Sequence, residues 1–363
     1  MKRLIDICDI QYGYAFDSKC FTEDSSYPQL VRIRDVKRGY SETYYSGDYP
    51  EEYILSEGDL LVGMDGEFNI ARWKCSGALL NQRVCKLVAK IGTNEEYLRF
   101  AMSKSLKEIE QRTAFVTVKH LSAKELNKLE LDVPELTKQD KIADILSRLE
   151  RVIEARKEEL EELDGLIKAR FVEMFGDPVT NPKGLPIVAL GELSKLITKG
   201  ASPSWQGFSY TDDSSQTIFV TSENVREGYI DLSSPKYIED GFNEKQKRSV
   251  IHKGDFLINI VGASIGRAAQ FNLDCKANMN QAAALVRVND SRVRDKYLLT
   301  YLNSDRAQRM YDSMKSDTGR ANLSLQDISD LLILLPNVEQ QIEFEMFANQ
   351  VDKSKFGKLS TLL

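Results

Sequence analysis

The chain has little of what metal-binding and acid–base catalytic sites require. Only two of its 363 residues are histidines, His120 and His252, so zinc binding or proton transfer through imidazole has few candidates. There are five cysteines, and no two of them have the Cys-x-x-Cys spacing of metal sites and redox dithiols. We therefore expect no metal, and we interpret all five as buried thiols: Cys8, Cys20, Cys75, Cys85 and Cys275.

Long apolar runs are also absent. No stretch approaches the roughly 18 uninterrupted apolar residues of a membrane span, and Met1–Asp6 lacks the apolar run of a secretory signal. The sequence thus predicts no membrane association and a cytoplasmic location. The net charge is −6, from 49 Lys and Arg against 55 Asp and Glu. That balance gives no support to a nonspecific polyanion binder coated in cations, but it permits a local basic patch.

Catalytic motifs are missing as well. The chain has no Gly-x-x-x-x-Gly-Lys-Ser/Thr and no Gly-x-Gly turn, which nucleotide and methyl-donor sites use. Asn181-Pro182 is followed by Lys183-Gly184, which departs from the Asn-Pro-Pro-aromatic signature of adenine methyltransferases. The acidic residues Asp59, Asp65 and Glu67 lie close together, but such residues are common in turns and we interpret them as structural. We expect no catalytic residues and no cofactor.

What the chain does contain is an internal repeat. Its length and its 42% of hydrophobic residues predict two folded domains. Segment 30–40 aligns with segment 219–229, and four further pairs of blocks follow in the same order. They are 55–62 with 251–258, 78–82 with 277–281, 97–98 with 297–298, and 120–139 with 322–341. An unbroken order over five blocks predicts a duplication.

Each copy is predicted to be α+β. The short Val-, Ile- and Leu-rich runs 59–64 and 255–261 follow Gly-Asp turns and predict strands. The segments 94–112 and 292–314 carry apolar residues at helical spacing and predict one closing helix per copy.

A different pattern follows each copy. From Gln139, apolar residues recur at alternating spacings of four and three up to Gly176-Asp177-Pro178, which predicts a long helix with a coiled-coil seam. A shorter version follows Pro336. Since a lone amphipathic helix leaves its apolar stripe in water, we expect an antiparallel coiled coil that relates two similar mixed α/β domains by a pseudo-twofold axis. Two solvated linker helices are the alternative. The predicted parts are the domains 1–137 and 177–336 and the helices 138–176 and 337–363.

Two similar domains held at a fixed separation suit two half-sites on duplex DNA. Basic clusters, a tryptophan in a polar loop and paired amides supply side chains that can contact phosphates, guanine and adenine. The candidate DNA-binding residues are Arg32, Arg34, Lys37, Arg38, Arg72, Asn81, Gln82, Lys119, Lys199, Trp205, Lys245, Lys247, Arg248, Arg267, Asn280, Gln281 and Arg320.

Several elements together resemble a known family, the specificity subunits of type I restriction-modification systems. They are Phe-Val-Glu-Met-Phe-Gly-Asp-Pro at 171–178, Gly-Ala-Ser-Ile-Gly-Arg at 262–267, the Asn-Gln pairs, and Pro-x-x-x-x-Gln at 134–139 and 336–341. The first copy has Asn-Ile-Ala-Arg where the second has Ile-Gly-Arg, so its Gly turn is expected to differ.

The resemblance implies two target-recognition domains, each reading half of a split site in double-stranded DNA. It also implies helices that space the domains and dock methyltransferase subunits, two of them, which carry the methylation chemistry, and restriction subunits that join through the complex. The helix residues expected to contact a partner are Phe171, Met174, Phe175, Ile342 and Phe347. The second helix is shorter than is usual in the family, which makes docking at that end an open expectation.

Two other functions remain open. One is a non-catalytic scaffold that binds proteins and assembles through its coiled coil. The other is a nuclease or methyltransferase with an unrecognised site, which activity of the purified chain with metal or methyl donor would reveal.

Overall fold

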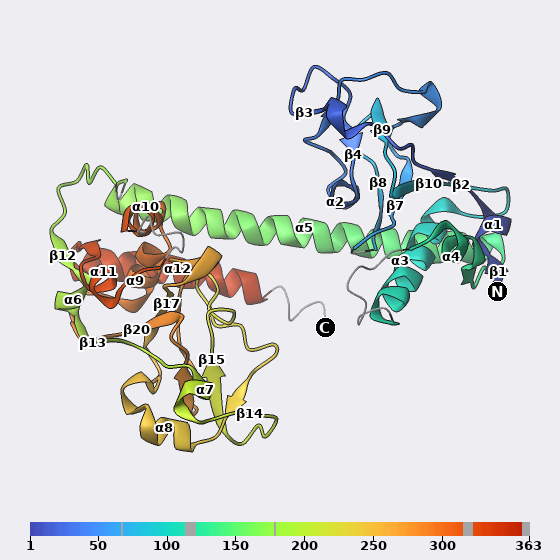
Figure 1. The fold of residues 1–363 in the computed structure, drawn as a ribbon. Coiled ribbons are helices and arrows are strands. Elements are labelled where there is room, and N and C mark those ends of the chain that lie inside the picture. The colour runs from blue at the N-terminus through green and yellow to red at the C-terminus, as the bar shows by residue number, and fades with distance from the viewer. Residues whose placement is uncertain (67, 113–120, 178, 315–321, 358–363) are drawn as a thin grey trace. The chain divides into compact units, whose positions relative to one another are not determined.

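The computed structural model of the protein describes residues 1–66, 68–112, 121–177, 179–314 and 322–357. The chain divides into two compact units, unit 1 (Met1–Arg156) and unit 2 (Lys157–Leu363). In Figure 1 the colour runs from blue at the start of unit 1 to red at the end of unit 2. Helix α5 (Leu136–Phe175) begins in unit 1 and ends in unit 2. None of the described helices is long and apolar enough to cross a lipid bilayer.

Unit 1 is built on a four-stranded antiparallel sheet in the order β2-β10-β7-β8. Leu98, Met102 and Leu106 of helix α3 are buried in one core with Leu60 and Leu87 of the sheet. A smaller sheet has the order β4-β9-β6. The elements are β1 (Lys2–Arg3), α1 (Leu4–Ile7), β2 (Cys8–Tyr12), β3 (Phe21–Thr22), β4 (Leu30–Val31), α2 (Ile33–Val36), β5 (Tyr44–Tyr45), β6 (Ile54–Leu55), β7 (Leu60–Gly63), β8 (Ile70–Arg72), β9 (Ala78–Leu80), β10 (Val84–Ala89), α3 (Glu95–Arg112), α4 (Ala123–Lys128) and β11 (Glu130–Leu131).

Unit 2 has a four-stranded antiparallel sheet in the order β13-β20-β17-β18 and a second sheet in the order β14-β16-β15-β19. Its largest core cluster joins this first sheet to the helices that close the unit. The elements are β12 (Ile187–Ala189), α6 (Leu190–Leu193), β13 (Ser194–Lys199), α7 (Pro203–Gln206), β14 (Tyr210–Thr211), β15 (Thr217–Val220), β16 (Tyr237–Ile238), α8 (Gly241–Lys245), β17 (Phe256–Asn259), β18 (Ala268–Gln270), β19 (Ala277–Met279), β20 (Ala283–Val288), α9 (Asp295–Leu302), α10 (Asp305–Met314), α11 (Leu325–Ser329), β21 (Leu332–Leu334) and α12 (Val338–Gly357).

The two units share one topology. Both have the four-stranded antiparallel sheet, and both pair two further strands in parallel, β4 with β9 and β15 with β19. Asp59 and Asp255, which end the two Gly-Asp turns, each accept a hydrogen bond from the backbone N–H three residues earlier, at 2.8 and 2.7 Å. Ser122 and Ser324 each form a capping box with the residue three positions later. The predicted duplication and the mixed α/β class of both copies are confirmed.

One predicted helix is interrupted. The segment 292–314 forms two helices, α9 and α10, instead of one. Asn303 lies at the break, where its Oδ1 accepts from the N–H of Ala268 at 3.0 Å and its Nδ2 donates to the carbonyl of Ala268 at 2.9 Å. The prediction of a continuous helix was wrong because this contact to the edge strand β18 takes the chain out of helical geometry.

Helix α5 confirms the long helix that the four-three spacing predicts. Its 40 residues give a length of about 60 Å. It ends before Gly176, whose φ of +82° is the left-handed conformation that a helix-terminating glycine adopts. The N–H of Gly176 donates to the carbonyl of Val172 at 2.7 Å and closes the last turn.

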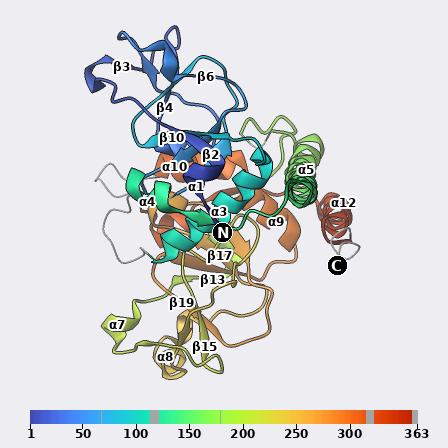
Figure 2. The same ribbon diagram turned by 90° about the vertical axis from the view of Figure 1, so that its right-hand side faces the viewer.

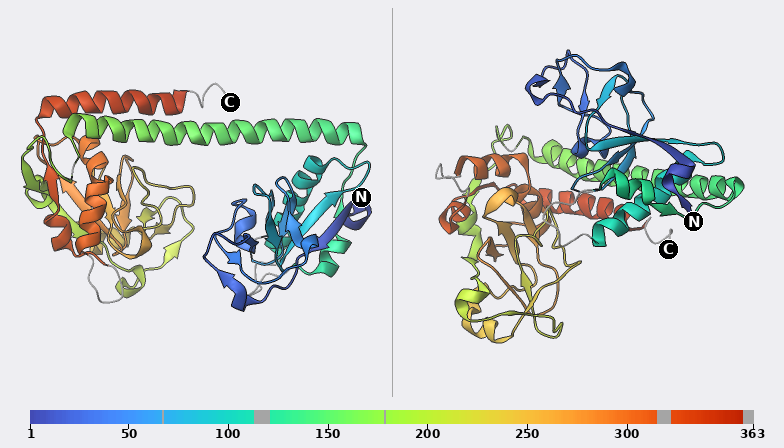
Figure 3. Two further views of the ribbon diagram at one scale, coloured as in Figure 1. Left: turned by 90° about the horizontal axis from the view of Figure 1, so that it is seen from above. Right: turned by 45° about the vertical axis from the view of Figure 1, so that its right-hand side comes forward.

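Within unit 2, helix α12 packs against the last part of α5. The rings of Phe171 and Phe344 meet edge to face with their centroids 5.4 Å apart. Arg170 pairs with Glu343 at 2.7 Å, and Lys355 near the end of α12 pairs with Asp164. The contacts near residue 170 of α5 involve the start of α12, whereas Asp164, earlier in α5, contacts Lys355 near the end of α12. The two helices therefore pair antiparallel, as expected. Figures 2 and 3 show the two helices side by side.

The cysteines correct one expectation. All five are free, but only Cys8 and Cys85 are buried, while Cys20 and Cys75 are half-buried and Cys275 is exposed. The prediction of five buried thiols was therefore wrong for three of them. Burial raises the pKa of Cys8 to about 12, so this thiol stays protonated at neutral pH.

Candidate nucleic-acid interface

Four cations gather on one turn of unit 1. Arg32, Arg34, Lys37 and Arg38 are all exposed, on and beside the single-turn helix α2. The buried carboxylate of Asp35 holds the turn in place by accepting from the N–H of Arg32 at 3.0 Å and from Ser41 Oγ at 2.9 Å. Arg34 Nε lies 3.8 Å from the same carboxylate, but the Arg34 side chain is still 62% exposed. All four cations are therefore open to solvent, where they can meet phosphate groups.

A fifth cation, which no local sequence pattern indicates, joins this cluster. Gly39 has a φ of +81°, and a Cβ built on it would lie only 2.6 Å from the Lys74 side chain. The N–H of Lys74 donates to the Gly39 carbonyl at 3.1 Å. Lys74 is exposed and distant in sequence from the other four, so only the turn at Gly39 reveals the contact. We call Arg32, Arg34, Lys37, Arg38 and Lys74 the unit 1 basic cluster.

Unit 2 gathers its predicted residues around two short helices. Trp205 lies on α7, and Lys245 ends α8. Lys245 Nζ donates to the carbonyl of Gln206 at 2.9 Å and so links α8 to α7. Lys247 and Arg248 follow directly and are exposed. Lys199 ends β13, four residues before α7 begins, and is also exposed.

The two Asn-Gln pairs differ from what their sequence suggested. Asn81 is only 7% exposed, so little of its amide is open to a base, and as a DNA contact it stays a prediction. Gln82 is exposed beside it. In unit 2, Asn280 is half-buried and its Oδ1 accepts from the N–H of Ala282 at 3.0 Å, while Gln281 is exposed. The two glutamines are the members available for hydrogen bonds to a base edge.

Arg83, which follows Gln82 in unit 1, has a strained backbone. Arg83 has a φ of +74°, a conformation that is uncommon outside glycine. Its guanidinium lies 2.9 Å from the Asp65 carboxylate. No sequence pattern signals this conformation, which turns Gln82 and Arg83 outward together.

Arg72 and Arg267, the arginines that follow the Gly-containing turns of the two units, differ in their surroundings. The Arg72 guanidinium pairs with Glu95 at 3.1 Å and with Glu96, and donates to the Gly58 carbonyl at 2.6 Å. These contacts hold Arg72 against the fold of unit 1, and its assignment to a DNA interface stays a prediction. Arg267 is exposed, as an interface residue must be. Lys119 and Arg320 lie outside the described residues.

The residues expected to bind a partner subunit differ in their exposure to solvent. Phe171 and Phe175 are buried in the core of unit 2 and carry its contact to α12, so their assignment to a partner interface is wrong. Met174 and Phe347 are half-buried, and Phe347 lies 5.7 Å from the Arg170 guanidinium. Ile342 is exposed. The motif that suggested a docking site is therefore largely a packing motif.

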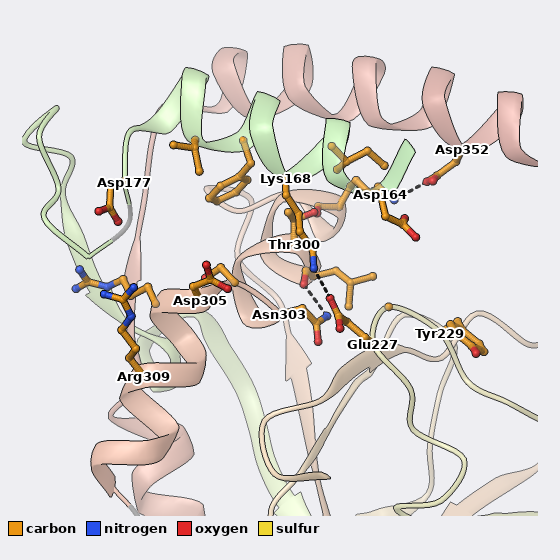
Figure 4. A pocket seen from close by; sticks show the side chains of 18 of the residues that line it. Asp164, Lys168, Asp177, Glu227, Tyr229, Thr300, Asn303, Asp305, Arg309 and Asp352 are labelled. Atoms are coloured by element: carbon orange, nitrogen blue, oxygen red, sulfur yellow. Dashed lines mark hydrogen bonds and ion pairs between the residues drawn. The ribbon is translucent and has the colours of Figure 1, made fainter. Parts of the chain in front are cut away.

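Unit 2 also holds a groove of about 850 Å³ between the end of α5, the α9–α10 break and the loop with Glu227, shown in Figure 4. Its cations are matched by carboxylates: Lys168 Nζ lies 2.8 Å from Glu227, and Lys296 Nζ lies 2.5 Å from Asp352. Burial alone would raise the pKa of Asp352, but the hydrogen bonds from Lys296 and Lys355 outweigh it and hold that pKa below its usual value. The groove is therefore not a basic surface, and we do not include it in the candidate interface.

The acidic residues at the two Gly-Asp turns have structural partners. Asp59 lies 2.9 Å from Lys86, and Asp255 lies 2.7 Å from Arg287. Among the described residues, no group of three His, Cys, Asp or Glu side chains could hold a metal ion. Glu67 lies outside the described residues.

A duplicated mixed α/β frame with separate basic clusters and a long helix defines a modular DNA-recognition protein. The family model described as the type I restriction modification DNA specificity domain matches residues 1–164 and 182–357, and the chain belongs to this family.

Individual relatives support the assignment. The specificity subunit of the type I restriction enzyme EcoBI from Escherichia coli is 31% identical over 369 residues, which cover 93% of this chain and 76% of that protein. The MjaVIII specificity subunit of Methanocaldococcus jannaschii is 20% identical over 303 residues, 80% of this chain and 71% of that protein. The crystal structure of the S subunit from M. genitalium covers 99% of this chain and 92% of its own, with a TM-score of 0.54 and 14% identity, and so shows a like fold.

Proposed function

We propose that each unit reads one half of a two-part site in double-stranded DNA, and that α5 and α12 set the distance between the halves. The domain limits we assign are 1–137 and 177–336, with the helices 138–176 and 337–363 as the spacing elements. A recognition subunit must reach DNA, so we place the protein in the cytoplasm.

One comparison carries this proposal. Arg32 N donates to Asp35 Oδ2 at 3.0 Å in unit 1, and Thr221 N donates to Asn224 Oδ1 at 2.8 Å at the equivalent turn of unit 2. The turn is the same, but unit 1 presents Arg34 where unit 2 presents Glu223. Equal frames with opposite charges at an exposed position suit two modules that contact different base sequences.

The remaining candidates form the proposed contact surface. In unit 1 they are the basic cluster and Gln82, and in unit 2 they are Lys199, Trp205, Lys245, Lys247, Arg248, Arg267, Asn280 and Gln281. The cations contact phosphates, and the amides read base edges. Four residues remain candidates from the sequence alone: Arg72, Asn81, Lys119 and Arg320.

Methyltransferase subunits, two of them, are the partners we propose for the helices, and restriction subunits join through the complex. Four aliphatic side chains of α5 are exposed within unit 1, Ile145, Leu149, Val152 and Ile153. A stripe of this kind is stabilised when a partner covers it. On α12 the exposed Ile342 and Met346 form a smaller patch, with Met174 and Phe347 half-buried nearby in the same core.

The chain itself supplies recognition in this proposal and no catalysis. Methylation and cleavage then reside in the partner subunits, together with the methyl donor and any metal. Activity of the purified chain with metal or methyl donor would contradict this part.

The test is selection of duplexes from a random library by the chain in complex with its methyltransferase. We expect two short conserved blocks separated by a spacer of constant length. The chain alone should bind more weakly and with strong dependence on salt. A complex that selects one uninterrupted block, or none, would contradict the proposal and favour a protein-binding scaffold.

A further inference from the structure

Unit 2 exposes a tryptophan. Trp205 is 89% exposed and is the most exposed aromatic side chain among the described residues, whereas the other tryptophan, Trp73, is 1% exposed. An indole offers a large apolar area, and its burial against a ligand is favourable. Such a side chain left in solvent needs an explanation beyond the folding of unit 2.

Several contacts hold the segment that carries Trp205. Helix α7 begins at the buried Pro203 and ends at Gly207, whose φ of +83° lets its N–H donate to the Ser204 carbonyl at 3.2 Å. The ring of Phe208 then packs edge to face on Phe242, with the centroids 5.6 Å apart. A ligand that covers Trp205 therefore meets a surface already in place, with little entropy lost on ordering the backbone.

The surroundings of Trp205 favour a nucleic acid over a protein. Lys245 donates to α7 itself, and Lys247 and Arg248 continue the same segment. Ser204 beside Trp205 is exposed and its hydroxyl lies 3.2 Å from that of Ser202, so hydrogen-bonding groups flank the indole. Nucleic-acid-binding surfaces combine cations that contact phosphates with aromatic rings and hydroxyls that contact bases. The segment around Trp205 offers all three kinds of group.

Unit 1 does not repeat this feature. The short segment that follows β2, as α7 follows β13, is the 3-10 turn Ser18–Cys20, and its central residue is Lys19. The tryptophan is thus a property of unit 2 and not of the shared frame. It belongs with the features that make the two units read different sequences.

We infer that Trp205 makes an apolar contact with one base in the half-site read by unit 2 and determines the preference at that position. This rests on the proposed function. The apolar surface is either the 5-methyl group of a thymine or the face of a partly unstacked base, since both offer the indole the same chemistry.

The experiment compares complexes of the full chain and its methyltransferase that carry wild-type Trp205, Trp205→Phe or Trp205→Ala. Each is titrated with the selected duplex and with every single-base variant of it. We expect Trp205→Ala to lose about tenfold to a hundredfold of discrimination at one position of one half-site, with the other half unchanged. Trp205→Phe should keep most of it, because an aromatic face remains. Replacing a critical thymine with deoxyuracil removes only the methyl group, so a loss of binding there identifies the methyl as the contact. Retained binding identifies the base face.

Lys247→Ala, at an exposed cation two residues after the end of α8, serves as the matched control. It should weaken binding to all duplexes alike and leave the discrimination ratios unchanged, because a phosphate contact carries no sequence information. A wild-type complex that selects a two-part site, with a Trp205→Ala complex that keeps every ratio, overturns this inference and leaves the proposed function standing. A loss of methyltransferase from the complex upon Trp205→Ala assigns the tryptophan to a protein interface and also overturns it. A wild-type complex without sequence preference overturns both.

Discussion

Gln139 and Gln341 occupy equivalent places in the two units. Each donates from Nε2 to the carbonyl of the proline five residues earlier at 2.8 Å. Each accepts at Oε1 from the backbone N–H of the residue that precedes the closing helix, Asn94 at 2.9 Å and Arg294 at 2.8 Å. Both side chains are buried. The Pro-x-x-x-x-Gln element thus ties the start of a long helix to the globular part of its unit.

Gln341→Ala should destabilise unit 2 because it leaves buried carbonyls and an N–H without partners. We expect a loss of about 2–4 kcal/mol in the free energy of unfolding, measured by chemical denaturation. Gln350→Ala, on an exposed part of the same helix, should change it by less than about 0.5 kcal/mol. Equal effects of the two variants would contradict a structural role for Gln341.

Phe344→Ala tests the pairing of α12 with α5. Phe344 is fully buried between the rings of Phe171 and Phe175, and its removal leaves a cavity. The expected loss is about 3–5 kcal/mol in the free energy of unfolding. Met346→Ala is the control, because that side chain is 69% exposed, and it should cost less than about 1 kcal/mol. A small effect of Phe344→Ala would mean that the helices do not pack in solution.

Asp352→Asn should make stability less dependent on pH. The folded pKa of Asp352 lies below its unfolded value, so its contribution is fully present above the ordinary carboxyl pKa and is lost as pH falls through the folded pKa. At neutral pH the variant should be less stable by about 2 kcal/mol. The difference should shrink in acid, as unfolding curves at pH 7 and below the ordinary carboxyl pKa would show. Asp274→Asn, at an exposed residue, is the control and should change the free energy of unfolding by less than about 0.5 kcal/mol.

Lys37→Ala with Arg38→Ala should weaken DNA binding by the complex. If both residues contact phosphates, the slope of log affinity against log salt should fall by about 1.8. The double variant Lys104→Ala with Lys107→Ala removes the same charge from the exposed face of α3 and should leave the slope unchanged. Equal slopes for the wild type and the Lys37 and Arg38 variant would remove these residues from the interface.

The fold was largely predictable because its signals are periodic. The repeat, the strands after the Gly-Asp turns and the long helix ending before Gly176 all follow from spacing and turn residues. The break at Asn303 was not predictable, because it depends on a side-chain contact to a strand far away in sequence.

The site was predictable only in part. The exposed cations of 32–38 follow from local composition, whereas Lys74 joins them through the turn at Gly39. Sequence pattern also could not separate Arg72, which pairs with Glu95 and Glu96, from the exposed Arg267. Phe171 and Phe175 resembled docking residues because a core aromatic and an interface aromatic share the same chemistry.

The most direct test exchanges one unit and maps adenine methylation in cells that contain the chain and its methyltransferase. Residues 182–335 would be replaced by the matching segment of a relative with a different target. We expect a methylated two-part sequence in which one part changes completely while the other part and the spacer stay the same. Changes in both parts, or a site that stays as it was, would contradict the claim that each unit reads its own half.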